Sequence, residues 1–217
     1  MLGDRVLFLD GEALVIDKPA GLPVDRPRDG AISLENHLES LRLGFRRWPM
    51  AVHRLDRDTS GCLLLSRNPK AHARFQQAFE QGLVAKRYVA ILDAVPRATA
   101  GLIDLPLAKI SSAEQGWRMT GDPRGKSART AWTLLAEKDG RALVEFRPET
   151  GRTHQIRVHA REGLGAAVTG DAVYGAAHPA GMMLHAAALT VPRAGKPDVA
   201  AEAPWPERFA AAGFDHG

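Results

Sequence analysis

The stretch that decides the fold and the chemistry is Val52-His53-Arg54-Leu55-Asp56-Arg57-Asp58-Thr59-Ser60-Gly61, which runs directly into the apolar Cys62-Leu63-Leu64-Leu65. A short apolar run of this kind is typical of a buried strand. Asp56 stands just before it, between Arg54 and Arg57. An isolated surface pair of aspartate and arginine would be ordinary and worth about 0–1 kcal/mol. A carboxylate flanked by arginines at this place is poorly explained by packing, and it indicates a site.

The composition describes a globular protein with a basic surface. The chain has 217 residues, of which 45% are hydrophobic and 25% are charged, so it can bury a sizeable core as one domain or as two closely packed lobes. The net charge is +4 at pH 7. This charge favours a polyanionic partner, with nucleic acid first among the candidates.

The cysteine content and the N-terminus predict a cytoplasmic protein. Cys62 is the single cysteine, which excludes an internal disulfide framework and favours a reducing compartment. The segment 1–10 carries acidic residues around a four-residue apolar run, which is not a signal peptide, and no stretch of the chain is long enough to cross a bilayer.

The first half of the chain predicts strands and two helices. Asp10-Gly11 signals a tight hairpin between the apolar runs 6–9 and 13–16. Ser33 is a plausible N-cap for a helix with Leu34, Leu38 and Leu41 on one face. Asn68-Pro69 predicts the start of a second helix that ends near Gly82 and returns the chain to a strand at 88–92.

The second half predicts mostly antiparallel strands. Between residues 101 and 146 short apolar runs alternate with turns such as Lys138-Asp139-Gly140. A helix over 153–162, capped by Thr153 and ended at Gly163, and a late core strand over 183–191 complete the pattern. The order of elements favours an α+β fold, a mixed and largely antiparallel sheet with helices packed on it.

The residues His53-Arg54-Leu55-Asp56, followed by Thr59-Ser60-Gly61, resemble the signature of the RluA-type RNA pseudouridine synthases. Further blocks in the order of that family cover nearly the whole chain. They are Asp17-Lys18-Pro19-Ala20-Gly21-Leu22-Pro23-Val24, Lys86-Arg87-Tyr88-Val89-Ala90, Gly125-Lys126-Ser127-Ala128-Arg129-Thr130, Thr150-Gly151-Arg152-Thr153-His154-Gln155-Ile156-Arg157-Val158-His159 and Gly170-Asp171-Ala172-Val173-Tyr174-Gly175. One block would be weak support, whereas six in order are strong.

The resemblance implies a single catalytic domain over 1–217, with two sub-lobes of the sheet flanking a central RNA-binding cleft. It makes Asp56 the catalytic residue, acting as a nucleophile at C1′ or as a base at C2′. One carboxylate suffices because uracil leaves as a delocalised anion, unlike the leaving group of a typical glycosidase. The sequence begins almost directly at these motifs, so we expect the short form without the N-terminal S4 domain.

Three further residues take roles from the resemblance. Arg157 contacts the catalytic aspartate and keeps it ionised, Tyr88 stacks on the uracil and assists removal of the C5 proton, and Arg54 helps to displace the target uridine. Without the motif, Tyr88 would be a strand residue in the core and Arg157 a solvent-facing helix residue. The remaining expected contacts with RNA come from His53, Arg152, Thr59, Arg46 and Arg47.

No metal or cofactor is expected. The histidines His53, His154, His159 and His185 lack the spacing of metal ligands. The run 121–127 is one residue short of a P-loop and is followed by a strand-like segment, so nucleotide triphosphate binding is rejected.

We therefore expect an RNA pseudouridine synthase that is a monomer without an obligatory protein partner and modifies ribosomal RNA, transfer RNA or both. The alternatives are a non-catalytic RNA-binding factor, which would be expected to have lost Asp56 or Arg157, and a nucleoside hydrolase, which would need a second water-activating group or a metal.

Overall fold

The computed structural model describes residues 2–27, 29–112 and 116–215. The chain forms two compact units: unit 1 comprises Met1–Lys86 and Ala186–Pro204, and unit 2 comprises Arg87–His185 and Trp205–Gly217. The chain changes unit inside two strands, β5 (Ala85–Leu92) and β11 (Leu184–Val191). A single domain with a central cleft stays a prediction. No helix in the described part of the chain is long and apolar enough to span a membrane.

Unit 1 is an antiparallel sheet. The strands are β1 (Val6–Leu9), β2 (Ala13–Lys18), β3 (Met50–Ala51), β4 (Ser60–Ser66) and β12 (Val199–Glu202). β2 pairs with β1 and β4, β3 pairs with β4, and β12 pairs with β11, all antiparallel. The hairpin predicted at Asp10-Gly11 is confirmed, and Asp10 Oδ1 accepts from the backbone N–H groups of Glu12 and Ala13 at 2.8 Å.

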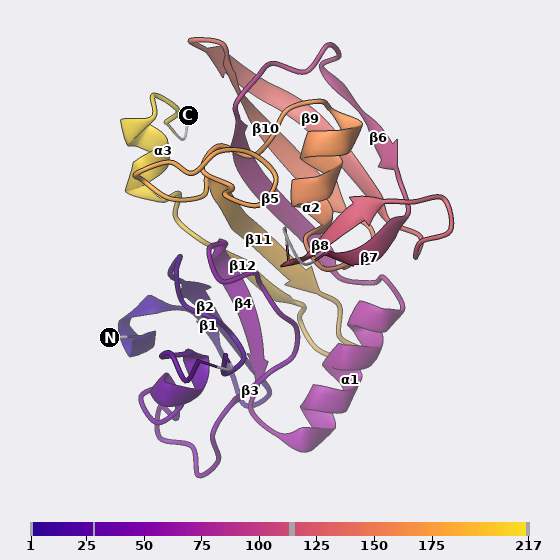
Figure 1. Cartoon of the computed structure of the whole chain (residues 1–217). Coiled ribbons are helices and arrows are strands. Elements are labelled where there is room, and N and C mark those ends of the chain that lie inside the picture. The colour runs from indigo at the N-terminus through magenta and orange to yellow at the C-terminus, as the bar shows by residue number, and fades with distance from the viewer. Residues whose placement is uncertain (1, 28, 113–115, 216–217) are drawn as a thin grey trace. The chain divides into compact units, whose positions relative to one another are not determined.

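One helix covers the core of unit 1. The predicted helix after Asn68 is confirmed as α1 (Pro69–Glu80), with the Asn68 side chain accepting from Ala71 N at 2.9 Å. Phe75 of α1, Leu64 of β4 and Val15 of β2 belong to one cluster of buried residues, and Figure 1 shows α1 beside the strands of this unit. All seven residues of β4 are buried, as the apolar run 62–65 predicts.

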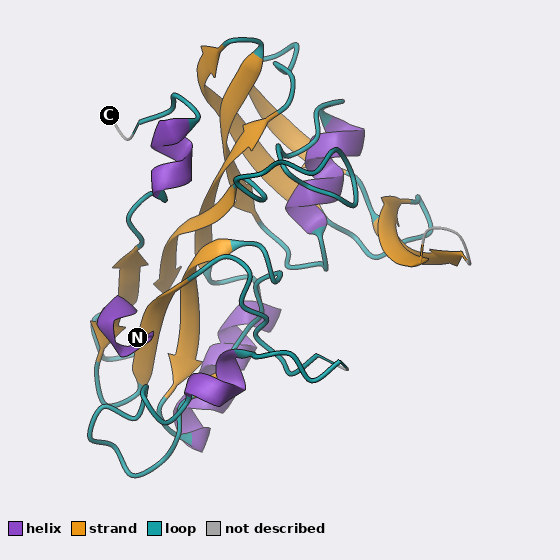
Figure 2. Cartoon of the chain, turned by 60° about the vertical axis from the view of Figure 1, so that its left-hand side comes forward, coloured by secondary structure: helices purple, strands orange, loops and turns teal. Residues whose placement is uncertain are grey.

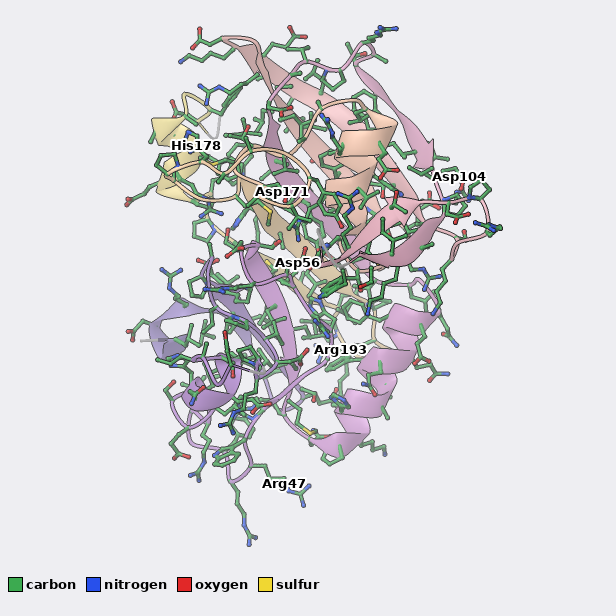
Figure 3. All side chains as sticks on the ribbon, in the orientation of Figure 1. Arg47, Asp56, Asp104, Asp171, His178 and Arg193 are labelled. Atoms are coloured by element: carbon green, nitrogen blue, oxygen red, sulfur yellow. The ribbon has the colours of Figure 1, made fainter. Side chains whose placement is uncertain are left out.

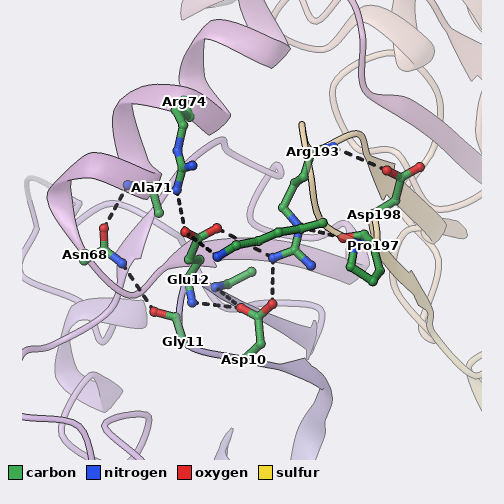
Figure 4. A network of polar contacts seen from close by, with 11 residues as sticks. Asp10, Gly11, Glu12, Asn68, Ala71, Arg74, Arg193, Pro197 and Asp198 are labelled. Carbon is green, nitrogen blue, oxygen red and sulfur yellow. Dashed lines mark hydrogen bonds and ion pairs between the residues drawn. The ribbon is translucent and has the colours of Figure 1, made fainter.

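A network of charges fastens the β1–β2 turn of unit 1 (Figure 4). Glu12 accepts from Arg74 of α1 at 2.6 Å and from Lys196 at 3.0 Å. Arg193, in the loop between β11 and β12, lies 2.6 Å from Asp10. The contacts join three segments that are far apart in sequence at the end of the hairpin.

The prediction of a helix that begins after Ser33 and includes Leu34, Leu38 and Leu41 is wrong in its extent. The structure has single 3₁₀ turns at η1 (Leu2–Arg5) and η2 (Leu34–His37). Ser33 is the N-cap of η2, and its N–H donates to Asn36 Oδ1 at 3.0 Å. The chain leaves the helical path before Leu41, because a tight turn with left-handed residues at Leu43 and Gly44 follows closely. The helix-like spacing of these leucines therefore reflects burial of Leu34 and Leu41, without a regular helix.

Unit 2 contains the sheet β5–β10–β9–β6, with all three pairings antiparallel. The bounds are β6 (Ala100–Asp104), β9 (Arg129–Lys138) and β10 (Arg141–Pro148). The predicted turn between β9 and β10 is confirmed, with left-handed φ values at Asp139 and Gly140. A separate hairpin, β7 (Leu107–Ser112) with β8 (Gly116–Gly121), stands away from this sheet in Figure 2.

The helices of unit 2 are short. α2 (Gln155–Val158) continues into the π-helical turn η3 (His159–Gly163), and α3 (Glu207–Ala211) lies near the C-terminus. The predicted end at Gly163 is confirmed, but Thr153 is not the cap. His154 precedes the helix with a φ of 53°, because the chain turns sharply there before the helical residues begin. Ile156 of α2 packs into a core with Phe146 and Trp132.

Candidate active site

Asp56 lies in the loop that enters β4 of unit 1. Val52 N donates to Leu64 O at 3.0 Å, and Thr59 N donates back to Asp56 O at 3.1 Å, which closes the turn. Thr59 is buried, whereas Asp56, which is labelled in Figure 3, is partly exposed. The buried strand thus begins within a few residues of a carboxylate that reaches the surface. A direct contact of Thr59 with RNA stays a prediction.

Lys18 fixes the backbone beside Asp56. Its side chain is fully buried, and Nζ donates to Pro19 O and Leu22 O at 2.8 Å and to Arg57 O at 3.0 Å. Burial of an ammonium group is costly unless its N–H groups donate hydrogen bonds. The three carbonyl groups are therefore needed to keep Lys18 buried. Lys18 therefore ties the loop that follows β2 to the residue next to Asp56.

Gly61 is required by a close approach of the backbone. It pairs with Lys18 across β2 and β4 and has a φ of 107°. A Cβ atom at this position would lie 2.2 Å from the carbonyl oxygen of Ala186, also in unit 1. The backbone conformation and the close approach of Ala186 thus explain why glycine occupies this position of the Thr-Ser-Gly motif.

The arginines at positions 46, 47, 54 and 57 differ in their partners. Arg54 forms an exposed ion pair with Asp25 at 2.9 Å, and Arg57 Nε donates to Gly21 O at 3.3 Å. Both Arg46 and Arg47 are exposed and form no ion pair in the described part of the chain. An exposed pair such as Arg54 with Asp25 is weak, so Arg54 can exchange its carboxylate for another anion at little cost.

The His53 side chain makes contacts that support the fold of unit 1. Its ring stacks on Phe79 of α1 with centroids 4.6 Å apart, and Nε2 accepts from Leu64 N at 3.0 Å. Burial, together with the positive charge of Lys86, lowers the pKa of His53 to about 4. The ring is therefore neutral at pH 7 and supports the start of the motif, while a contact with RNA stays a prediction.

In unit 2, Arg157 is held by Asp171. Arg157 Nε and Nη2 donate to the two carboxylate oxygens at 2.7 and 2.8 Å, and both side chains are buried. Burial alone would raise the pKa of Asp171, but the Arg157 guanidinium and the N–H groups of Val173 and Tyr174 lower it below its ordinary value. The pairing of Arg157 with Asp56 stays a prediction.

The segment before α2 is ordered by a buried glutamine. Gln155 Oε1 accepts from Thr150 Oγ1 at 2.7 Å and from Arg152 N at 2.9 Å, while Nε2 donates to Arg129 O and Thr130 Oγ1. The exposed side chain of Arg152 bends back to Ser127 O at 2.9 Å. The surface position of Arg152 is consistent with a contact to phosphate, which stays a prediction.

Tyr88 lies on β5 opposite Phe146 of β10, partly buried and packed against the core of unit 2. This is the strand position expected from composition. A role of the ring against the uracil stays a prediction.

The histidines have local partners. His159 contacts Thr130 Oγ1 at 2.8 Å and Leu105 O at 3.0 Å, and His154 contacts Tyr174 OH at 2.9 Å. Among the described residues no three side chains of histidine, cysteine, aspartate or glutamate gather as metal ligands would. The run 121–127 leads into β9, so it has no helix N-terminus of the kind a P-loop needs.

Lys18, Gln155 and Asp171 have no role that the sequence predicts, although each lies in one of the motifs of the family. A lysine at the end of an apolar strand was the available signal for Lys18, since such a residue must find buried acceptors. Nothing local pointed to the pairing of Asp171 with Arg157, because it joins residues on different segments.

Residues 12–162 match the family model described as RNA pseudouridylate synthase. The chain is 58% identical to an uncharacterized RNA pseudouridine synthase of Zymomonas mobilis over 99% of both chains. It is 37% identical to ribosomal large subunit pseudouridine synthase D of the same organism, covering 79% of this chain and 56% of that protein. The solved structure of human RNA pseudouridylate synthase domain containing 4 matches with a TM-score of 0.80 and 26% identity, over 96% of this chain and 91% of that one.

Proposed function

The chain belongs to the RluA-type RNA pseudouridine synthases, which are isomerases, and on that premise we propose that Asp56 is the catalytic residue. The supporting observation is the position of Asp56. It is a partly exposed carboxylate on a loop that Lys18 holds rigidly at the start of a buried strand. Such support keeps a reacting group in one geometry, which is what catalysis by positioning needs.

The reaction breaks the N1–C1′ bond of a uridine, turns the released uracil, and joins C5 to C1′ with loss of the C5 proton. In our proposal the Asp56 carboxylate works at the sugar, either on C1′ or on the C2′ proton. Tyr88 lies against the base, and Arg157, held in place by Asp171, keeps Asp56 ionised. Arg54 moves from its exposed partner Asp25 toward the substrate and aids displacement of the uridine.

The proposed substrates are uridines in ribosomal RNA, transfer RNA or both, modified by a monomer in the cytoplasm. The name of the Zymomonas mobilis ribosomal large subunit relative supports the ribosomal part of this proposal. His53, Thr59 and Arg152 are the further proposed contacts with the substrate or its backbone. No cofactor or metal takes part in the proposed steps.

The test is a map of pseudouridine in total RNA from cells with and without the gene. We expect specific positions to lose pseudouridine without the gene and to regain it when the wild-type gene returns. A copy encoding Asp56→Asn should leave them unmodified. Identical maps with and without the gene would contradict the proposed function, and the positions that change would assign the RNA class.

A further inference from the structure

A strained turn in unit 1 points to a binding site away from Asp56. Phe45 N donates to Arg42 O at 2.9 Å across Leu43 and Gly44, whose φ values are 47° and 83°. Glycine adopts such values freely, but for Leu43 they cost about 1–2 kcal/mol. Strain of this kind persists only where neighbouring contacts hold it, and it is common at binding sites.

Arg67 is the residue that holds this turn. It follows β4, its side chain is buried, and its guanidinium donates to Leu41 O at 2.8 Å and to Arg42 O. The Phe45 ring covers the guanidinium, with its centroid 3.6 Å from the central carbon. In the described part of the chain Arg67 has no carboxylate partner, and its buried Nε has no hydrogen-bond partner. A positive charge is thus buried without a counter-ion.

The residues after the turn add two more uncompensated charges. Arg46 and Arg47 are exposed and unpaired among the described residues. The nearby carboxylate of Glu39 is already occupied, since it accepts from Arg42 Nη1 at 2.8 Å and from Trp48 Nε1 at 2.9 Å. The side chains of Phe45, Arg46, Arg47 and Arg67 line one open pocket. Three guanidinium groups that share a pocket without an acidic residue favour an anion.

The pocket lies far from Asp56 within unit 1. The Asp56 loop precedes β4 and Arg67 follows it. A seven-residue strand advances about 3.3 Å per residue, so about 20 Å separate its two ends. Figure 3 shows Arg47 projecting at the end of the unit opposite Asp56. An anion bound here cannot be the phosphate of the reacting uridine.

We propose that this pocket, formed by Phe45, Arg46, Arg47 and Arg67, binds a backbone phosphate of the RNA substrate several nucleotides from the target uridine. Arg46 and Arg47 contact the phosphate, and Arg67 is a positioning residue that acts through the strained turn. The inference rests on the proposed function only in taking RNA as the substrate. It implies that the RNA contacts unit 1 at two separate places, near Asp56 and at this pocket.

The test uses binding, which does not depend on turnover. The probe is a twelve-residue oligouridylate with a 5′-hydroxyl and a 3′-fluorescein, followed by fluorescence anisotropy between 50 and 200 mM KCl. Replacing both Arg46 and Arg47 by alanine should reduce the log–log salt slope by about 0.7, the value for one phosphate contact on a single strand. The control, Lys70→Ala with Arg97→Ala, also removes two exposed charges and should leave the slope near the wild-type value.

The positioning role of Arg67 is tested by coupling. Arg67→Lys should weaken binding about fivefold in the wild-type background and less than about twofold when Arg46 and Arg47 are already alanine. A merely structural role would weaken both backgrounds equally. The midpoint of urea unfolding, measured for each variant, establishes that every variant is folded under the conditions of the binding assay.

Three results would overturn the proposal: an unchanged slope in the double variant, an equal loss of slope in the control, or equal effects of Arg67→Lys in both backgrounds. A fourth arm uses the same RNA with a 5′-phosphate. Tighter binding of that RNA, lost with Arg46 and Arg47, would assign the pocket to a terminal phosphate and overturn the backbone assignment. An unchanged RNA map without the gene would overturn the enzymatic function while leaving these binding results intact.

Discussion

The buried ammonium group of Lys18 donates a hydrogen bond to the carbonyl oxygen of Arg57 over 3.0 Å, thirty-nine positions further along the chain. Arg57 is the neighbour of Asp56, so a residue at the end of β2 fixes the backbone of the proposed catalytic loop. The same ammonium also donates to Pro19 O and Leu22 O, so it joins the loop that follows β2 to the loop that contains Asp56.

Replacing Lys18 by methionine should both destabilise the protein and slow turnover. The change keeps the length of the side chain but removes the donor of the hydrogen bonds to Pro19 O, Leu22 O and Arg57 O, at a cost of about 2–5 kcal/mol in the free energy of unfolding. Urea unfolding measures the loss, and tritium release from C5-labelled uridine in RNA measures turnover. Lys70→Met, at an exposed position on α1, should change stability by less than about 0.5 kcal/mol. Wild-type stability and turnover in Lys18→Met would refute the structural role.

Asp56→Asn should abolish isomerisation and keep RNA affinity within about tenfold of wild type. The substitution preserves size but removes the anion, and most of the affinity should come from phosphate contacts elsewhere. Tritium release reports turnover because C5 loses its hydrogen when it bonds to C1′, and filter binding gives the affinity. Mass spectrometry must first exclude deamidation back to aspartate. Substantial tritium release would then move the chemistry to another residue, whereas loss of binding as well would indicate a structural role.

Asp171→Asn should cost about 3–5 kcal/mol of unfolding free energy, because it removes the buried carboxylate that accepts two hydrogen bonds from the Arg157 guanidinium. Turnover should fall with it if Arg157 acts in catalysis. The matched control is Asp104→Asn, which breaks the exposed ion pair with Arg129 and should cost less than about 1 kcal/mol. Equal losses of unfolding free energy in the two variants would show that the buried pair stabilises the protein no more than the exposed pair does.

His53 should make stability sensitive to mild acid. Its folded pKa of about 4 lies below the ordinary value of 6.5, so its contribution is complete above pH 6.5 and is lost as the pH falls toward 4. The difference in unfolding free energy between wild type and His53→Gln should therefore shrink between pH 7 and pH 4, by about 1–3 kcal/mol. His178→Gln, at an exposed position, is the control. A difference that is constant with pH would contradict a neutral His53 ring in the folded protein.

The sequence alone determined the features that depend on neighbouring residues. The cap at Asn68, the turns at Asp10-Gly11 and Asp139-Gly140, and the buried strand after Gly61 follow from side-chain chemistry within a few positions. The motif around Asp56 also identified the family, because its residues are contiguous in the chain.

Only the tertiary structure decided the contacts between distant segments. Lys18 finds the carbonyl of Arg57, Asp171 finds Arg157, and Arg67 holds the turn at Leu43 from the far end of β4. The leucine spacing after Ser33 misled for the same reason: burial against other segments, and not helical periodicity, selected those residues. A buried charge must be matched by groups that the fold brings near it, and a linear pattern carries no information on which groups those are.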